Sequence, residues 1–170
     1  MKKAGFTLIE LLISISVVSI LLGLSYAGYA KLSQRQNLIS SGQTMKNILR
    51  DVQSRSFSGE IDCSPSACNC SLTSSNLTGW YVDFSNRIQY GQCEAISFSS
   101  KDFGISPEIT LAPYLTPASS KLLFRRSPPS ADRGGTICLS DKNMVNSYYK
   151  VSIDTSGSIS DNGTINETCP

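Results

Sequence analysis

The most regular hydrophobic pattern in the chain is an uninterrupted apolar run near its beginning. From Leu11 to Ala30 no side chain carries a formal charge. A helix rises about 1.5 Å per residue, so this run covers about 30 Å, the thickness of the hydrocarbon core of a bilayer. The pattern predicts a helix that crosses a membrane. Lys2 and Lys3 precede the run, and the positive-inside rule places them in the cytoplasm and the rest of the chain outside.

Beyond this run, the pattern changes to a single apolar stripe on a polar helix. Apolar side chains recur at helical spacings at Leu38, Met45, Leu49 and Val52, with Ile48 alongside. No proline occurs before Pro65. We therefore expect a nearly continuous helix from about Phe6 to about Phe57, roughly 75–80 Å long, whose second half packs on the rest of the protein.

The second half of the chain alternates with a period of two, which predicts strands with one buried face. Strands are expected at 79–85, 87–91, 95–99, 122–125, 136–139 and 148–153, with a weaker edge strand near 109–111 and a last short segment at 158–160. Trp80, Val82 and Phe84 are expected to point inward, as are Ile96 and Phe98. The fold class is therefore α+β: a long N-terminal helix packed on a small, mainly antiparallel sheet.

The same patterns divide the chain into five segments. Residues 1–5 precede the helix, 6–30 form its membrane-spanning part and 31–57 its amphipathic part. Residues 58–78 are a polar, cysteine-rich stretch that predicts an irregular loop, and 79–170 form a β-rich globular head. About a hundred residues outside the helix are enough for one small core.

All the cysteines follow the apolar run, at Cys63, Cys68, Cys70, Cys93, Cys138 and Cys169. An outward topology places them in an oxidising compartment, which favours disulfides. The sequence leaves all fifteen full pairings of six cysteines open, although Cys169 is expected to tie down the C-terminal tail. A zinc site at Cys63, Cys68 and Cys70 is the alternative, but the spacing is unusual for zinc and the chain has no histidine.

The composition gives little support for catalysis or for a cofactor. There is no histidine to act as a base near neutral pH, no pair of carboxylates at a recognisable spacing, and no glycine-rich phosphate loop. We therefore expect a protein that is not an enzyme and binds no cofactor.

One carboxylate, Glu10, lies at the start of the apolar run. A charged side chain within a membrane span costs about 2.5–3.5 kcal/mol on insertion scales. Such a residue is a poor choice for a simple anchor, so we expect Glu10 to have a cationic partner.

The residues around Glu10 carry a resemblance to a known family. Met1-Lys2-Lys3-Ala4-Gly5, followed by Phe6-Thr7-Leu8-Ile9-Glu10, resembles the processing signature of the type IV pilins and of the pseudopilins of type II secretion. The resemblance implies that residues 1–5 are a leader, that a prepilin peptidase and N-methyltransferase cleaves after Gly5, and that Phe6 becomes the methylated N-terminus. It also implies that Glu10 and Thr7 act in assembly, where the glutamate meets the terminal amine of a neighbouring subunit.

The resemblance further implies where the protein resides and what it contacts. It implies a bacterial inner-membrane protein with a single span and its head outside the cytoplasm, which later enters a pilus or pseudopilus. Its partners would be other pilin or pseudopilin subunits, an inner-membrane assembly platform and membrane lipid. An ordinary secretory signal or an uncleaved signal anchor is the alternative, although the small-x-small site near Ser25–Ala27 is mediocre.

Motifs in the second half of the chain point to one group within this family. Leu122-Leu123-Phe124, Gly135–Leu139 and Tyr149–Ile153 before Gly157 resemble the head of the H-type minor pseudopilins and related minor pilins, although Gly157-Ser158 replaces the Gly-Arg of many relatives. This resemblance implies a minor structural subunit that helps to initiate or assemble a filament, with a major pilin as the alternative.

Nucleic-acid binding is a second functional hypothesis, because some minor pilins take up DNA. Basic side chains at Lys121, Arg125, Arg126 and Arg133 predict a patch that contacts phosphate. Against this, cleavage would remove Lys2 and Lys3 and leave thirteen basic and thirteen acidic side chains. The mature chain would therefore lack the overall positive charge typical of a dedicated nucleic-acid binder.

Overall fold

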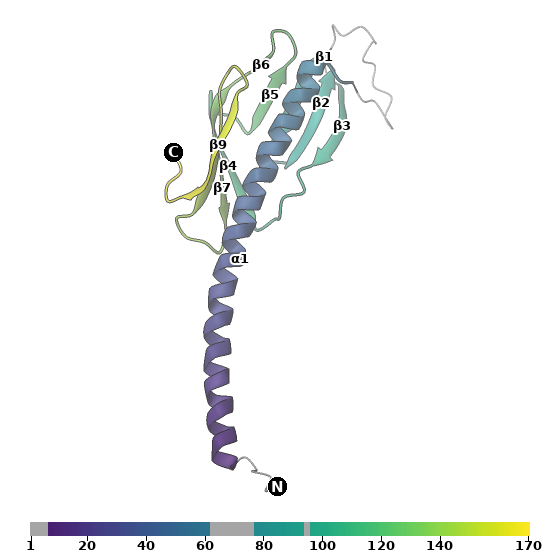
Figure 1. The fold of residues 1–170 in the computed structure, drawn as a ribbon. Helices are drawn as coiled ribbons and strands as arrows, with labels where there is room; N and C mark the ends of the chain where they lie inside the picture. Colours follow the sequence, from purple (N-terminus) through teal and green to yellow (C-terminus); the bar gives the residue numbers. More distant parts are fainter. Residues whose placement is uncertain (1–6, 62–76, 94–95) are drawn as a thin grey trace. The chain divides into compact units, whose positions relative to one another are not determined.

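The computed structural model describes residues 7–61, 77–93 and 96–170. The helix α1 spans Leu8–Ser58 and is followed by strands (Figure 1). The strands are β1 Leu77–Asp83, β2 Ile88–Cys93, β3 Ile96–Asp102, β4 Ile109–Thr116, β5 Lys121–Arg125, β6 Ser130–Ala131, β7 Gly134–Asp141, β8 Tyr148–Ile153 and β9 Ile159–Asn166. The chain forms two compact units, Met1–Gln36 and Asn37–Pro170, here called the N-terminal unit and the head unit.

The described part of the N-terminal unit is helical and apolar. Its mean hydropathy over the best window is 2.3, and by length and composition α1 qualifies as a membrane-crossing helix. The large apolar side chains are exposed, from Leu8 at 81% to Val17 at 51%. Ser14, Ser16 and Ser19 donate their hydroxyls to backbone carbonyls four residues earlier, so these polar groups are satisfied within the helix.

In the head unit, the second half of α1 buries the apolar stripe that the sequence predicts. Leu38, Met45, Leu49 and Val52 are all fully buried, which confirms the helical period of that stripe. Gly42 lies directly against the ring of Tyr149, where a Cβ atom would be only 2.1 Å from Cδ1. A glycine at this position therefore lets the helix approach the sheet closely.

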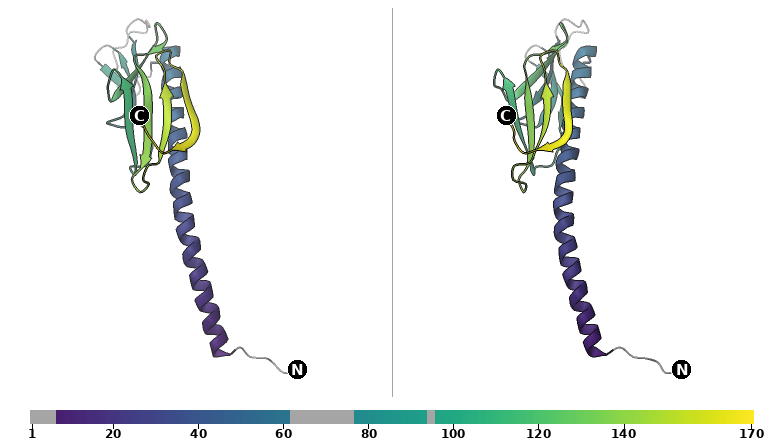
Figure 2. Two further views of the ribbon diagram at one scale, coloured as in Figure 1. Left: turned by 90° about the vertical axis from the view of Figure 1, so that its left-hand side faces the viewer. Right: turned by 60° about the vertical axis from the view of Figure 1, so that its left-hand side comes forward.

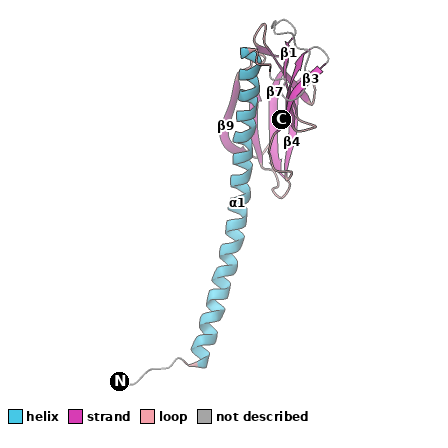
Figure 3. Ribbon diagram, turned by 90° about the vertical axis from the view of Figure 1, so that its right-hand side faces the viewer, coloured by secondary structure: helices cyan, strands magenta, loops and turns pink. Residues whose placement is uncertain are grey.

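The strands form two antiparallel sheets rather than the single sheet expected from the sequence. One has the order β3-β2-β1-β5-β6 and the other the order β4-β7-β8-β9. We call them sheet A and sheet B. Figure 3 shows both sheets beside the C-terminal half of α1, and Figure 2 shows β9 lying along the helix. Alternation along a strand shows which face is buried but not which sheet the strand joins, so the division was not predictable.

One core fills the space between α1 and the inner faces of the two sheets. Trp80, Val82 and Phe84 are buried on sheet A as expected, and Ile137 and Leu139 are buried on sheet B. Phe98 is also buried.

The prediction for Ile96 is wrong, because this side chain is 45% exposed. It pairs with Cys93 at the very end of β3, the edge strand of sheet A. Ile96 thus lies at a corner of sheet A, whereas Phe98, two residues further along β3, reaches the core.

Polar contacts fix β9 to the helix. Lys46 Nζ lies 2.5 Å from Asp161 Oδ1, and the hydroxyl of Tyr149 donates to the other oxygen of the same carboxylate. Gln53 Nε2 donates to the carbonyl of Gly157 at 2.6 Å. The last strand is therefore held in register from the helix as well as by β8.

Candidate functional site

The N-terminal end of α1 is capped by Thr7 and Glu10. The backbone N–H and the hydroxyl of Thr7 donate to Glu10 Oε2 at 3.1 and 2.9 Å, and the N–H of Glu10 donates to Thr7 Oγ1 at 3.4 Å. These reciprocal bonds form a capping box, in which two backbone donors at a helix start are satisfied by side chains. Thr-x-x-Glu before an apolar run is the sequence signal of this motif.

The capping box gives Glu10 a local polar partner in an apolar setting. Glu10 is the sole charged side chain between residues 7 and 30, and its neighbours Ile9 and Leu11 are 67% and 58% exposed. Thr7 satisfies only part of the carboxylate, because both of its hydrogen bonds reach Oε2. The geometry therefore presents an anion on an exposed apolar helix, and its charge is not neutralised by any ion pair among the described residues.

The processing residues Gly5 and Phe6 lie outside the described residues, so their roles remain predictions. The sequence around them nevertheless meets an independent test. Residues 1–26 match the prokaryotic N-terminal methylation motif. This prepilin-type motif supports a type IV pilin or pseudopilin subunit, and it implies processing by a prepilin peptidase and assembly with other pilins.

The motif also indicates a structural role and a location in a membrane. Proteins with this motif are structural rather than catalytic, and the motif together with an apolar N-terminal helix fits a membrane-anchored pilin. The match ends at residue 26, so it does not distinguish the H-type heads from others. No curated protein and no solved structure matches the chain significantly.

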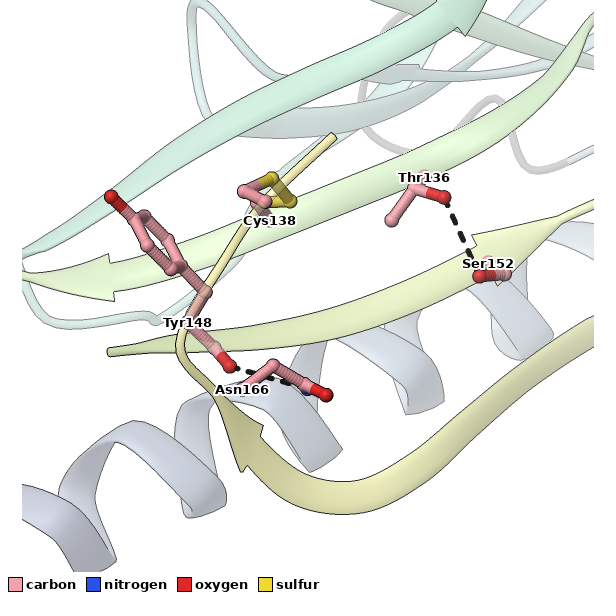
Figure 4. The surroundings of a disulfide bond; sticks show 6 residues. Thr136, Cys138, Tyr148, Ser152 and Asn166 are labelled. Carbon is pink, nitrogen blue, oxygen red and sulfur yellow. Dashed lines mark hydrogen bonds between the residues drawn. A yellow bond between two sulfur atoms is a disulfide. The ribbon is translucent and has the colours of Figure 1, made fainter. Parts of the chain in front are cut away.

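A disulfide ties the C-terminal tail to sheet B, as expected for Cys169. Cys138 of β7 is bonded to Cys169, with their Cα atoms 6.3 Å apart (Figure 4). Figure 4 shows Thr136 and Ser152 on one side of Cys138, and Tyr148 and Asn166 on the other. Cys93 is also disulfide-bonded. The other three candidates, Cys63, Cys68 and Cys70, lie outside the described residues.

The structure does not bring the basic side chains of the candidate DNA patch into one cluster. Lys121 and Arg125 occupy opposite ends of β5, which at about 3.3 Å per residue places their Cα atoms about 13 Å apart. Lys121 Nζ lies 3.2 Å from Asp83 Oδ2, and Arg133 Nε lies 2.7 Å from Asp132 Oδ2. Two of the four cations are therefore paired with carboxylates.

Arg125 and Arg126 lie together at the other end of β5. They line a hollow of about 770 Å³ with Phe57, Leu77 and Leu123 among its other walls. The guanidinium of Arg126 packs on Gly59, whose Cβ position would be 2.7 Å from Cζ of that arginine. Of the four predicted residues, Arg125 and Arg126 are therefore the two that lie side by side.

The two carboxylates that bond to lysine in the head unit, Asp83 and Asp161, both have a lowered pKa. Burial raises the pKa of Asp83, but hydrogen bonds from the backbone and side chain of Asn86 and from Lys121 outweigh it and hold the pKa below its usual value. Hydrogen bonds from Lys46 and Tyr149 likewise lower the pKa of Asp161. Burial, and then the bond to Asp161, raises the pKa of Tyr149 to about 12. Both acids are thus ionised parts of the folded framework.

Proposed function

We propose that this protein is a minor, structural subunit that helps to initiate or assemble a type IV pilus or a type II secretion pseudopilus. It would reside in the bacterial inner membrane with one span and its head outside the cytoplasm, until it is cleaved after Gly5 and enters a filament. The observation that carries the proposal is Glu10, an anion without an ion-pair partner among the described residues, on an exposed apolar helix and within a prepilin-type motif.

In the proposed mechanism, the charge of Glu10 sets the axial register between neighbouring subunits. Cleavage after Gly5 creates an α-amino cation on Phe6, four residues before Glu10. Within a bundle of apolar helices two opposite charges have few alternatives to pairing, because each is costly to leave unpaired in a medium of low dielectric. The terminal amine of one subunit and the Glu10 carboxylate of the next would then fix the axial offset between them.

The decisive experiment replaces Glu10→Gln. Glutamine preserves the size of the side chain and still completes a capping box, so the variant removes the charge and little else. We expect cleavage at Gly5 to continue, visible as the mature mass, while incorporation into sheared filaments falls at least about tenfold. Normal incorporation of Glu10→Gln would refute the pairing role.

Two further variants separate cap, charge and cleavage. Thr7→Val removes the hydroxyl of the capping box but leaves the carboxylate, so it tests whether Thr7 contributes to assembly beyond capping. Replacing Gly5 by a larger residue should block cleavage and leave the membrane-held form at its full mass. A major subunit remains the alternative role, and quantifying this chain in purified filaments distinguishes the two.

A further inference from the structure

Two basic side chains follow the apolar run of α1 directly. Lys31 comes immediately after Ala30, Arg35 lies one helical turn later, and both are exposed. Neither forms an ion pair with any described residue. The nearest acidic residues in the sequence are Glu10 and Asp51, far beyond the three or four residues that side chains on one helix can bridge. Among the described residues, this pair of cations therefore has no carboxylate partner.

The two cations lie side by side on the helix. Residues four apart share a face, with their Cβ atoms about 5–6 Å apart, and like charges at this spacing destabilise a helix slightly. An ammonium and a guanidinium at this distance can contact the same anion, and the guanidinium matches two phosphate oxygens at once. A phosphate shared by Lys31 and Arg35 would therefore offset their mutual repulsion.

The length of the apolar run sets the depth of this pair in a membrane. The hydrocarbon core is about 30 Å thick and the whole bilayer about 40–45 Å, which leaves a headgroup layer of about 5–7 Å on each side. With residues 11–30 filling the core, a rise of about 1.5 Å per residue puts Lys31 about 1.5 Å and Arg35 about 7.5 Å beyond its boundary. Helical side chains tilt toward the N-terminus, which brings Arg35 back toward the level of Lys31. Both charges therefore fall in the layer of lipid phosphates.

The residues on either side of the pair fit this depth. Tyr29 is 71% exposed, and tyrosines are enriched where the hydrocarbon meets the headgroups. The head unit begins only at Asn37. Lys31 and Arg35 therefore lie between an aromatic residue typical of the membrane interface and the first residue of the head, and they take no part in the core of the head.

Orientation of the chain does not account for the pair. The positive-inside rule counts basic residues close to a span, and it places Lys2 and Lys3 in the cytoplasm. Lys31 and Arg35 are equal in number to these two and lie on the other side of the span. The outer pair therefore opposes the orientation signal, whereas a role in binding explains its position.

We propose that Lys31 and Arg35 together bind the phosphate of an anionic phospholipid in the outer leaflet, before the subunit enters a filament. A zwitterionic phospholipid carries the same phosphate, but its own cationic group competes with the two side chains, so an anionic lipid binds more tightly. The proposal rests on the membrane-spanning helix proposed above, but it does not depend on the pairing of Glu10.

The test measures lipid binding to the full chain in a neutral detergent. Phosphatidylglycerol or phosphatidylcholine with the same acyl chains is titrated, and native mass spectrometry counts the bound lipids. A basic side chain near an anionic surface is worth a factor of about five in affinity. For the two residues together we expect phosphatidylglycerol to bind about 25-fold more tightly than phosphatidylcholine.

The variants separate this pair from the overall charge of the protein. Lys31→Gln with Arg35→Gln keeps two long polar side chains but removes both charges, so it should bind the two lipids alike. Arg50→Gln with Lys101→Gln is the matched control, because it removes the same charge from two exposed positions of the head unit that have no ion pair among the described residues. The control should keep the preference of about 25-fold.

Four outcomes overturn the proposal. The parent chain binds the two lipids alike, the Lys31/Arg35 variant keeps the preference, or the control variant loses as much of it. If the Lys31/Arg35 variant keeps the preference and fails to enter filaments, the pair contacts another subunit instead of lipid.

A separate result would test the membrane location itself. If the parent chain binds neither lipid, the membrane-spanning helix is refuted together with this site. The Glu10→Gln variant should keep the preference for phosphatidylglycerol, because lipid binding is measured on free subunits. A failure of the Glu10 pairing and a failure of the lipid site are therefore distinguishable.

Discussion

The two units of this protein use apolar residues in opposite ways. In the N-terminal unit, Leu8, Ile9 and Leu11 are more than half exposed, whereas in the head unit Leu38, Met45 and Leu49 are fully buried. Both sets belong to the same helix, α1. The head unit therefore builds its own core, and the N-terminal unit leaves its apolar surface for lipid or for other subunits to cover.

The two units also differ in whether their acidic side chains have a cationic partner within the chain. In the head unit the buried or half-buried acids Asp161 and Asp83 pair with Lys46 and Lys121, whereas Glu10 has a capping hydroxyl but no cation among the described residues. This comparison predicts a division of effects. Changes in the head unit should alter stability, and the change at Glu10 should alter assembly without altering the unfolding of the head.

The largest expected effect on stability comes from the disulfide of the head unit. Cys138→Ser with Cys169→Ser opens a loop closed over a sequence separation of 31. Loop-closure entropy for this length predicts a loss of about 3–4 kcal/mol. Denaturant unfolding of the full chain, followed by Trp80 fluorescence, measures it. An unchanged midpoint would mean that the tail contributes nothing to the stability of the head.

Most of the fold was predictable because the patterns were local. The period of the stripe from Leu38 to Val52 gave the amphipathic part of the helix, and the alternation around Trp80 and Val82 gave the first strand. The assignment of strands to two sheets, and the exposure of Ile96 at the end of an edge strand, depend on long-range pairing that alternation does not encode.

The candidate site was predictable in part for a related reason. Glu10 stands out because a charge is rare in an apolar run, and Thr7 at three residues before it is a local capping signal. The ion pair of Lys121 with Asp83 was not predictable, because the pairing of β1 with β5 brings these two residues together. Arg133 instead pairs with Asp132, its neighbour in the chain.

A second test of the comparison places the same substitution in each unit. Gly42→Ala puts a methyl group 2.1 Å from a carbon of the Tyr149 ring, and overpacking of this kind costs about 1–3 kcal/mol. Gly23 lies on the same helix with no heavy atom within 4 Å of its Cβ position. Gly23→Ala should therefore leave the head unchanged and favour helix by about 1 kcal/mol.

Thermal unfolding of the two variants in parallel shows whether α1 is tightly packed at Gly42 and loosely packed at Gly23. A lower midpoint for Gly42→Ala beside an unchanged midpoint for Gly23→Ala confirms that only the head half of α1 is tightly packed. Equal midpoints would show that the helix tolerates a methyl group against Tyr149.

A smaller effect should appear in the pH dependence of the head. The pKa of Asp161 is lowered in the folded state, so its contribution is present above the ordinary value of about 3.9 and is lost as the pH falls through the folded value. The pKa of Tyr149 is raised to about 12, so its contribution is complete below about 10 and is lost as the pH rises from 10 toward 12.

The variants Tyr149→Phe and Asp161→Asn separate the loss of stability at alkaline pH from the loss at acidic pH. The first should flatten the loss of stability between pH 10 and 12 relative to the parent chain, and the second should flatten the acidic loss below about pH 4. Guanidinium unfolding at fixed pH values measures both. If Tyr149→Phe loses stability above pH 10 as steeply as the parent chain, the ionisation of buried Tyr149 does not cause that loss.

The smallest effect is expected for the binding of nucleic acid to the basic side chains of the head unit. Arg125 and Arg126 are adjacent and line the same hollow, whereas Lys121 and Arg133 lie apart from them and each contacts a carboxylate. Any retention of the full chain on single-stranded DNA should therefore depend on the first pair, be abolished by Arg125→Ala with Arg126→Ala, and weaken steeply with salt. Lys121→Ala with Arg133→Ala is the matched control, because it removes the same charge from positions outside that hollow. Retention at low salt that both double variants reduce equally would show that the patch acts as the single surface suggested by the sequence, and no retention at low salt would remove the DNA-binding alternative.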